Sequence, residues 1–99
     1  MPEPVLRLNR ADRAVLGVIL TSPAWGLEIC EKTGLGTGAV YPALDRLMKA
    51  GLVIDKWEDP PPGSTLGFRY YHPAYEPWWY EQNGIMALAP SAAAGEKKT

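Results

Sequence analysis

Three stretches with helical apolar periodicity, followed by two strand-like stretches around a proline-rich loop, predict a mainly α-helical domain with a small antiparallel β-hairpin. The order helix, tight turn, second helix and hairpin over residues 25–71 is the ground plan of a winged helix-turn-helix. Such folds commonly place the second helix of the motif in the major groove of DNA. The 99 residues suffice for one modest core. We divide them into an N-terminal arm (1–8), the winged helix (9–73), an aromatic C-terminal segment (74–88) and a disordered tail (89–99).

Residues with known preferences for helix ends delimit the first two helices. Asn9 is suited to cap a first helix, which Ser22 and Pro23 would stop. A second helix is expected over residues 24–32, ended by Gly34 in a left-handed conformation.

The third helix, expected over residues 37–50, has a clear inward face. At 100° per residue, Val40, Leu44 and Leu47 fall on one apolar stripe. Pro42 is tolerable there because it lies near the start of the helix. The other side and its edges carry Gly38, Tyr41, Pro42, Asp45, Arg46 and Lys49.

Two short stretches after this helix read as a hairpin. Residues 52–57 and 66–71 alternate as strands do, and the Pro-Pro-Pro-Gly sequence at 60–63 must form the loop between them. This pair is the expected wing.

Charge and composition restrict the possible functions. The net charge of −1 and the pI of about 5.7 lack the basic bias of many nucleic-acid binders, so DNA affinity must come from a local patch. The single Cys30 fits a reducing compartment. The longest apolar run, residues 14–20, is too short to span a bilayer, and no secretory leader is visible. We therefore expect a soluble cytoplasmic protein.

No catalytic, metal or cofactor site is expected. The chain has one histidine, His72, one cysteine, and no spaced metal-ligand motif. The glycine-rich stretch 34–38 follows a helix rather than a strand, so it reads as a tight turn and not as a phosphate cradle. These features predict that the protein is not an enzyme.

The sequence motifs of the central region are more specific than its helical and strand patterns. It contains W-G-L-E-I-C (25–30), T-G-L-x-T-G-x-V-Y-P-x-L-x-R-L (33–47), A-G-L-V (50–53) and R-Y-Y (69–71). Over about residues 11 to 72 this resembles the PadR-like transcription regulators, particularly their short actinobacterial and phage-type members. The resemblance implies a DNA-binding regulator whose residues around T-x-V-Y-P read DNA.

We therefore assign DNA binding to the outward face of the third helix, the wing and the start of the first helix. In the third helix, Thr37 and Gly38 would meet base edges or backbone, and Tyr41 a thymine methyl or a phosphate. The full set is Thr37, Gly38, Tyr41, Pro42, Arg46, Lys49, Arg69, Arg10 and Arg13.

Structural interpretations of the same residues remain open. Thr37 could simply cap the helix, Tyr41 could pack on the wing, and Arg46 and Lys49 could form a solvated face. The trio Arg7, Arg10 and Arg13 could likewise be a solvated face partly paired with Asp12.

Two features depart from a DNA-binding surface. Asp45 lies in the middle of the outward face and would repel phosphate, unless it accepts from a cytosine amino group or pairs with Lys49 at i,i+4. Family members usually carry several arginines before R-Y-Y, whereas residues 63–68 here have none and only Arg69 remains.

The C-terminal segment also departs from the family, whose last helix pairs two subunits. Seven of the ten aromatic residues lie between residues 68 and 80, and Pro77 suits a first helical turn. Tryptophan and tyrosine are favoured at association surfaces. The predicted dimer interface comprises Tyr75, Trp78, Trp79, Gln82 and Ile85. The competing interpretation is a lid that covers the core.

The sequence thus favours a DNA-binding repressor that acts as a homodimer on an inverted-repeat operator of double-stranded DNA. The alternative is a winged helix that docks to a polymerase, a repressor or another protein. A small-molecule effector stays open, because the resemblance implies that some relatives bind small aromatic molecules near the dimer interface. No pocket for one is visible in the sequence.

Overall fold

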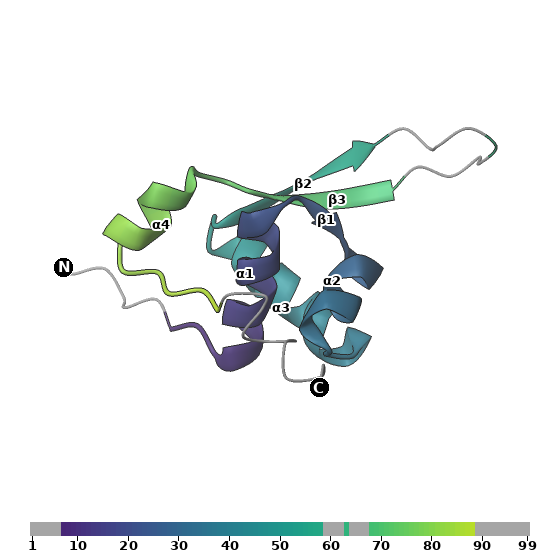
Figure 1. Cartoon of the computed structure of the whole chain (residues 1–99), viewed down its shortest axis with the longest axis horizontal. Coiled ribbons are helices and arrows are strands. Elements are labelled where there is room, and N and C mark those ends of the chain that lie inside the picture. Colours follow the sequence, from purple (N-terminus) through teal and green to yellow (C-terminus); the bar gives the residue numbers. More distant parts are fainter. Residues whose placement is uncertain (1–6, 59–62, 64–67, 89–99) are drawn as a thin grey trace.

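The computed structural model describes residues 7–58, 63 and 68–88. Outside this part lie residues 1–6 of the predicted arm (1–8), the predicted tail (89–99), most of the loop between the strands (59–62, 64 and 65), and the first two residues of the second predicted strand (66 and 67). The elements follow the predicted order (Figure 1): α1 (Arg10–Thr21), β1 (Ala24–Trp25), α2 (Gly26–Thr33), α3 (Thr37–Lys49), β2 (Val53–Glu58), β3 (Phe68–Pro73) and α4 (Pro77–Gln82). Three helices and an antiparallel sheet in this order form a winged helix-turn-helix, which confirms the predicted fold class.

Helix α1 begins with a reciprocal cap. The Asp12 backbone N–H donates to Asn9 Oδ1 at 2.8 Å, and the Asn9 N–H donates to Asp12 Oδ2 at 3.1 Å. This capping box satisfies two N–H groups that a helix start otherwise leaves unpaired. The predicted cap at Asn9 is confirmed, and the helix ends before Ser22 as expected.

Helix α2 differs from the prediction at its start. It begins at Gly26 rather than residue 24, because Ala24 and Trp25 form the short strand β1 and pair with Tyr71 and Tyr70. Two residues are too few to show the alternation that identifies a strand. The left-handed end at Gly34, with φ of 76°, is confirmed.

The sheet is antiparallel with the order β1-β3-β2. The hairpin prediction is confirmed. Strand β2 starts and ends one residue later than expected, and β3 ends two residues later. In its register Val53 pairs with Pro73, Asp55 with Tyr71, and Trp57 with Arg69. Because side chains alternate between faces, Val53, Asp55 and Trp57 share one face with these partners.

Helix α3 contributes its predicted stripe to the core. Val40, Leu44 and Leu47 are each at most 1% exposed. They meet the apolar face of α1 and the inner ends of β2 and β3, which together form one core. The helix is Thr37–Lys49, one residue shorter at its end than predicted.

The C-terminal segment closes this core. Tyr80 of α4 is buried, its hydroxyl donates to the Leu52 carbonyl at 2.5 Å, and it accepts from the Ala74 N–H at 3.0 Å. Beyond α4 the chain runs back along α1 (Figure 1), where the Leu88 N–H donates to the Arg13 carbonyl at 3.0 Å. A Cβ at Gly17 would lie 1.7 Å from the Leu88 carbonyl oxygen, so glycine permits this approach. The segment therefore acts as the lid that was one of its two interpretations.

Among the described residues, no helix combines the length and apolar character that crossing a membrane requires.

Candidate nucleic-acid interface

The outward face of α3 is open to solvent. Tyr41 is 42% exposed and the Lys49 side chain 76% exposed, while Leu44 on the opposite side is 1% exposed. Thr37, Gly38 and Pro42 are exposed too. Helix α4 does not cover them, since it lies beside the end of α1 (Figure 1). The face predicted to meet DNA is therefore accessible.

The first turn of α3 leaves room for a close neighbour. The N-cap residue is Gly36, with no side-chain hydrogen bond, so the interpretation of Thr37 as a cap is wrong. A Cβ added at Gly38 would meet nothing within 4 Å. The packing of this chain therefore does not require glycine at that position, although glycine costs an exposed helix about 1 kcal/mol relative to alanine.

Tyr41 packs against the start of α2. A Cβ at Gly26 would lie 2.1 Å from the Tyr41 hydroxyl oxygen, so the ring occupies the space that glycine leaves. Tyr41 is also near Tyr71 of β3, whose pKa is raised by burial, lowered by Arg69, and raised further by Tyr41 and Asp55. Tyr41 thus lies at the junction of α2, α3 and the sheet, with part of its ring in solvent.

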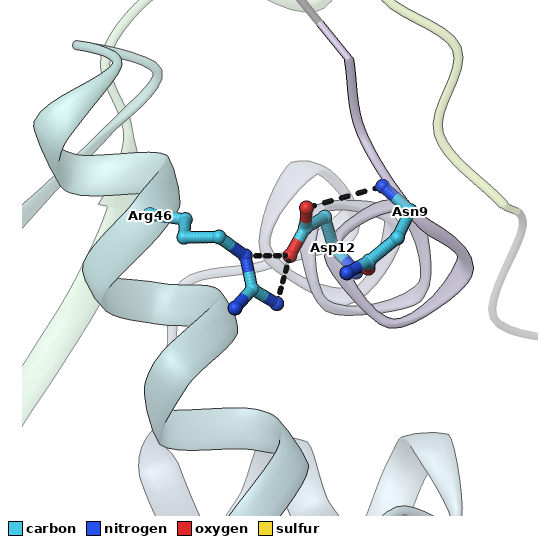
Figure 2. Close-up of polar contacts among 3 residues, drawn as sticks. All are labelled: Asn9, Asp12 and Arg46. Atoms are coloured by element: carbon cyan, nitrogen blue, oxygen red, sulfur yellow. Dashed lines mark hydrogen bonds and ion pairs between the residues drawn. The ribbon is translucent and has the colours of Figure 1, made fainter.

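Arg46 is held by a buried carboxylate on α1 (Figure 2). Its Nε and Nη2 both donate to Asp12 Oδ1, at 2.9 and 2.6 Å, while Asp12 Oδ2 accepts from the Asn9 backbone. Asp12 is only 1% exposed, and its hydrogen bond raises the pKa of Arg46. Arg46 therefore fixes α3 to α1. The phosphate contact predicted for Arg46 stays a prediction. The alternative interpretation paired Asp12 with Arg7, Arg10 or Arg13. Among the described residues, Asp12 forms its ion pair with Arg46 instead.

Lys49 and Asp45 form the i,i+4 pair that one interpretation of Asp45 required. The Lys49 Nζ lies 3.0 Å from Asp45 Oδ2, with both side chains more than half exposed. Exposed pairs of this kind contribute at most about 1 kcal/mol, so Lys49 can exchange its carboxylate for a phosphate at little cost.

Arg69, the wing cation, is also paired. Its Nε donates to Asp55 Oδ2 at 2.5 Å across the hairpin, and its guanidinium carbon lies 5.6 Å from the centre of the Tyr71 ring. The hydrogen bond to Asp55 is the largest cause of the raised pKa of Arg69. The side chain remains 46% exposed, so part of its charge faces solvent.

The arginines of α1 divide into two roles. Arg10 is exposed at the first residue of the helix. Arg13 instead holds the C-terminal segment, because its Nε donates to the Met86 carbonyl at 3.1 Å. The helical spacing of Arg10 and Arg13 does not predict this contact, because Arg13 and Met86 are 73 positions apart in the chain.

The residues predicted to form a dimer interface separate into an outer and an inner set. Trp78 is 58% exposed, and Tyr75 and Gln82 are exposed as well. Trp79 stacks on Tyr75, with ring centres 3.9 Å apart, and Ile85 packs against the core. Tyr80, which was not assigned a role from the sequence, is the one that anchors α4. Trp78 of the outer set borders a groove of about 510 Å³ whose lining also includes Leu20 and Met86.

Comparison with known proteins supports the fold. No protein-family model and no curated protein matches the chain. The solved structures similar to it include two with a TM-score of 0.66 each. Pex from Synechococcus sp. is 20% identical over 79% of this chain and 77% of Pex. The circadian clock associated protein Pex from Anabaena is 19% identical over 90% of this chain and 81% of that protein. At this identity the likeness concerns the fold alone.

Proposed function

We propose that the chain is a DNA-binding transcription regulator of the winged-helix type. The observation that carries this proposal is the outward face of α3, which is exposed around Tyr41 and Lys49 while Leu44 anchors the other side in the core. The Asp12–Arg46 pair fixes the orientation of the helix on α1. A rigid, exposed helix beside a hairpin is the arrangement with which such folds enter the major groove.

Within this interface, each residue has a distinct task. The first turn of α3, with Thr37 and Gly38, lets the protein backbone approach the duplex, and Tyr41 contacts base edges there. Lys49 and Arg69 neutralise phosphates, which position the protein without reading sequence. To do so, Lys49 leaves the Asp45 carboxylate and Arg69 leaves the Asp55 carboxylate.

We further propose that the protein belongs to the PadR-like regulators and acts as a homodimeric repressor in the cytoplasm. The sequence T-G-x-V-Y-P at 37–42 and R-Y-Y at 69–71 support the family. The exposed Trp78 and Tyr75 support association through α4. A two-fold dimer would read half-sites about one helical turn apart in an inverted repeat.

Binding of the purified full chain to duplex fragments from upstream of its own coding sequence tests the proposal. We expect a discrete complex in a gel-shift experiment at low salt that weakens as salt rises, because phosphate contacts dominate. A protein that binds no fragment at low salt would contradict the proposal.

A second candidate is a winged helix that docks to another protein. It is favoured by the pairing of Arg46, Lys49 and Arg69 with carboxylates of this chain, which reduces the positive field of the face. Failure to bind DNA, together with co-purification of a stoichiometric protein partner, would favour this candidate.

A further inference from the structure

Trp57 on the wing is exposed to an unusual degree. It is 72% exposed, more than any other large apolar side chain in the described part of the chain. Its side chain makes no hydrogen bond, ion pair or ring contact with another described residue. The packing of the described residues therefore gives no reason for an indole at this position.

The register places Trp57 on a defined face of the hairpin. It is directly opposite Arg69, and two residues inward Asp55 is opposite Tyr71, which is buried beneath the helices. Trp57 is thus on the side of the sheet that the helices cover, one residue before the end of β2.

This face is continuous with the exposed face of α3. The Arg69 guanidinium lies over the Tyr71 ring, and Tyr71 is near Tyr41 at the edge of α3. A surface that runs from Tyr41 past Arg69 to Trp57 joins the helix to the wing. Any duplex that meets both Tyr41 and Arg69 comes within reach of the indole.

We propose that Trp57 is a duplex-DNA contact of the wing, a proposal that rests on the function proposed above. Its apolar ring packs against deoxyribose, and its Nε1–H, which has no acceptor among residues 7–58, 63 and 68–88, donates to a phosphate oxygen. The contact does not read sequence, because sugar and phosphate are common to all nucleotides. It supplies affinity at a wing where residues 58–68 contain no lysine or arginine.

The test compares two substitutions of Trp57 with a control on the same strand. Ile54 is 42% exposed and points to the opposite face of the hairpin, so Ile54→Ala removes apolar surface without touching the proposed contact. We expect Trp57→Ala to weaken binding of a labelled duplex by about 5- to 10-fold, as for loss of one aromatic contact. Ile54→Ala should bind as the wild type does.

Two further readouts separate a direct contact from a structural effect. Trp57→Ala removes no charge, so the slope of log affinity against log salt should stay unchanged, whereas Arg69→Ala should reduce it by about one. DNA should also change the intrinsic tryptophan fluorescence of the wild type. That change should be absent from Trp57→Phe, which keeps the ring and still binds.

The outcomes that overturn the inference are distinct from those that overturn the proposed function. If the wild type binds duplex and Trp57→Ala binds equally well, or Trp57→Phe keeps the full fluorescence change, Trp57 is not a contact and the proposed function stands. If neither the wild type nor any variant binds duplex at low salt, both fail.

Discussion

Arg46 on α3 donates two hydrogen bonds, at 2.9 and 2.6 Å, to a single oxygen of Asp12 on α1. The other Asp12 oxygen accepts from the backbone that caps α1. One buried carboxylate thus joins the start of the first helix to the last turns of the helix that presents the candidate interface. The sequence predicts a phosphate contact for Arg46, and in the folded chain its hydrogen bonds join α3 to α1.

This link predicts the effect of Asp12→Ala on stability. The substitution removes one of the two hydrogen bonds of the capping box and leaves Arg46 without its partner, which should lower the free energy of unfolding by about 2–4 kcal/mol. The value is below that of a fully buried pair because the Arg46 side chain is 47% exposed. Denaturant unfolding measures it. Asp45→Ala, which breaks an exposed pair, is the control and should cost at most about 1 kcal/mol; equal losses would refute the special role of Asp12.

Gly38→Ala separates stability from binding. Because a Cβ there meets nothing within 4 Å, the variant should be as stable as the wild type or more stable by up to about 1 kcal/mol. Its DNA affinity should nevertheless fall, since the added methyl group keeps the helix from the duplex. Thermal unfolding and a gel shift on the same preparation check both halves. Unchanged affinity would mean that the first turn of α3 does not face DNA.

Alkaline pH should weaken the fold through its buried tyrosines. Burial raises the pKa of Tyr80 and of Tyr71 above the ordinary value of 10.0. A raised pKa in the folded state means that stability is complete below about pH 10 and is lost as pH rises through the folded pKa. Unfolding measured between pH 9 and pH 11 should show this fall, and Tyr80→Phe should make it shallower. An identical slope in the variant would show that Tyr80 does not contribute.

Association through α4 can be tested without disturbing the core. Trp78 is 58% exposed, so Trp78→Glu should leave the fold intact while a charge enters the proposed dimer interface. Light scattering should give a dimer for the wild type and a monomer for Trp78→Glu. Trp57→Glu, at a more exposed tryptophan that lies on the wing, should remain dimeric. A monomeric wild type would refute the proposed homodimer.

The sequence was informative where structure is local. The cap at Asn9, the end of α2 at Gly34 and the stripe of Val40, Leu44 and Leu47 all depend on spacings within a few residues, and all are confirmed. The two-residue strand β1 was missed because its pairing partner lies over 40 positions away in the chain.

The candidate site was predictable as a face but not as a network. Helical periodicity identified which side of α3 is exposed, and the i,i+4 spacing gave the Lys49–Asp45 pair. The contacts of Arg46 with Asp12 and of Arg13 with Met86 span 34 and 73 residues, so no local pattern signals them. Nor could the sequence decide which aromatic residue of α4 turns inward, because that choice depends on the position of the Leu52 carbonyl.

The central claim is that the exposed face of α3 binds duplex DNA, and the salt dependence of binding with Lys49 variants tests it most directly. Lys49→Ala should lower affinity for every duplex and reduce the slope of log affinity against log salt by about one. Lys49→Arg, which keeps the charge, should retain the slope. A Lys49→Ala variant with the affinity and the salt slope of the wild type would contradict the account.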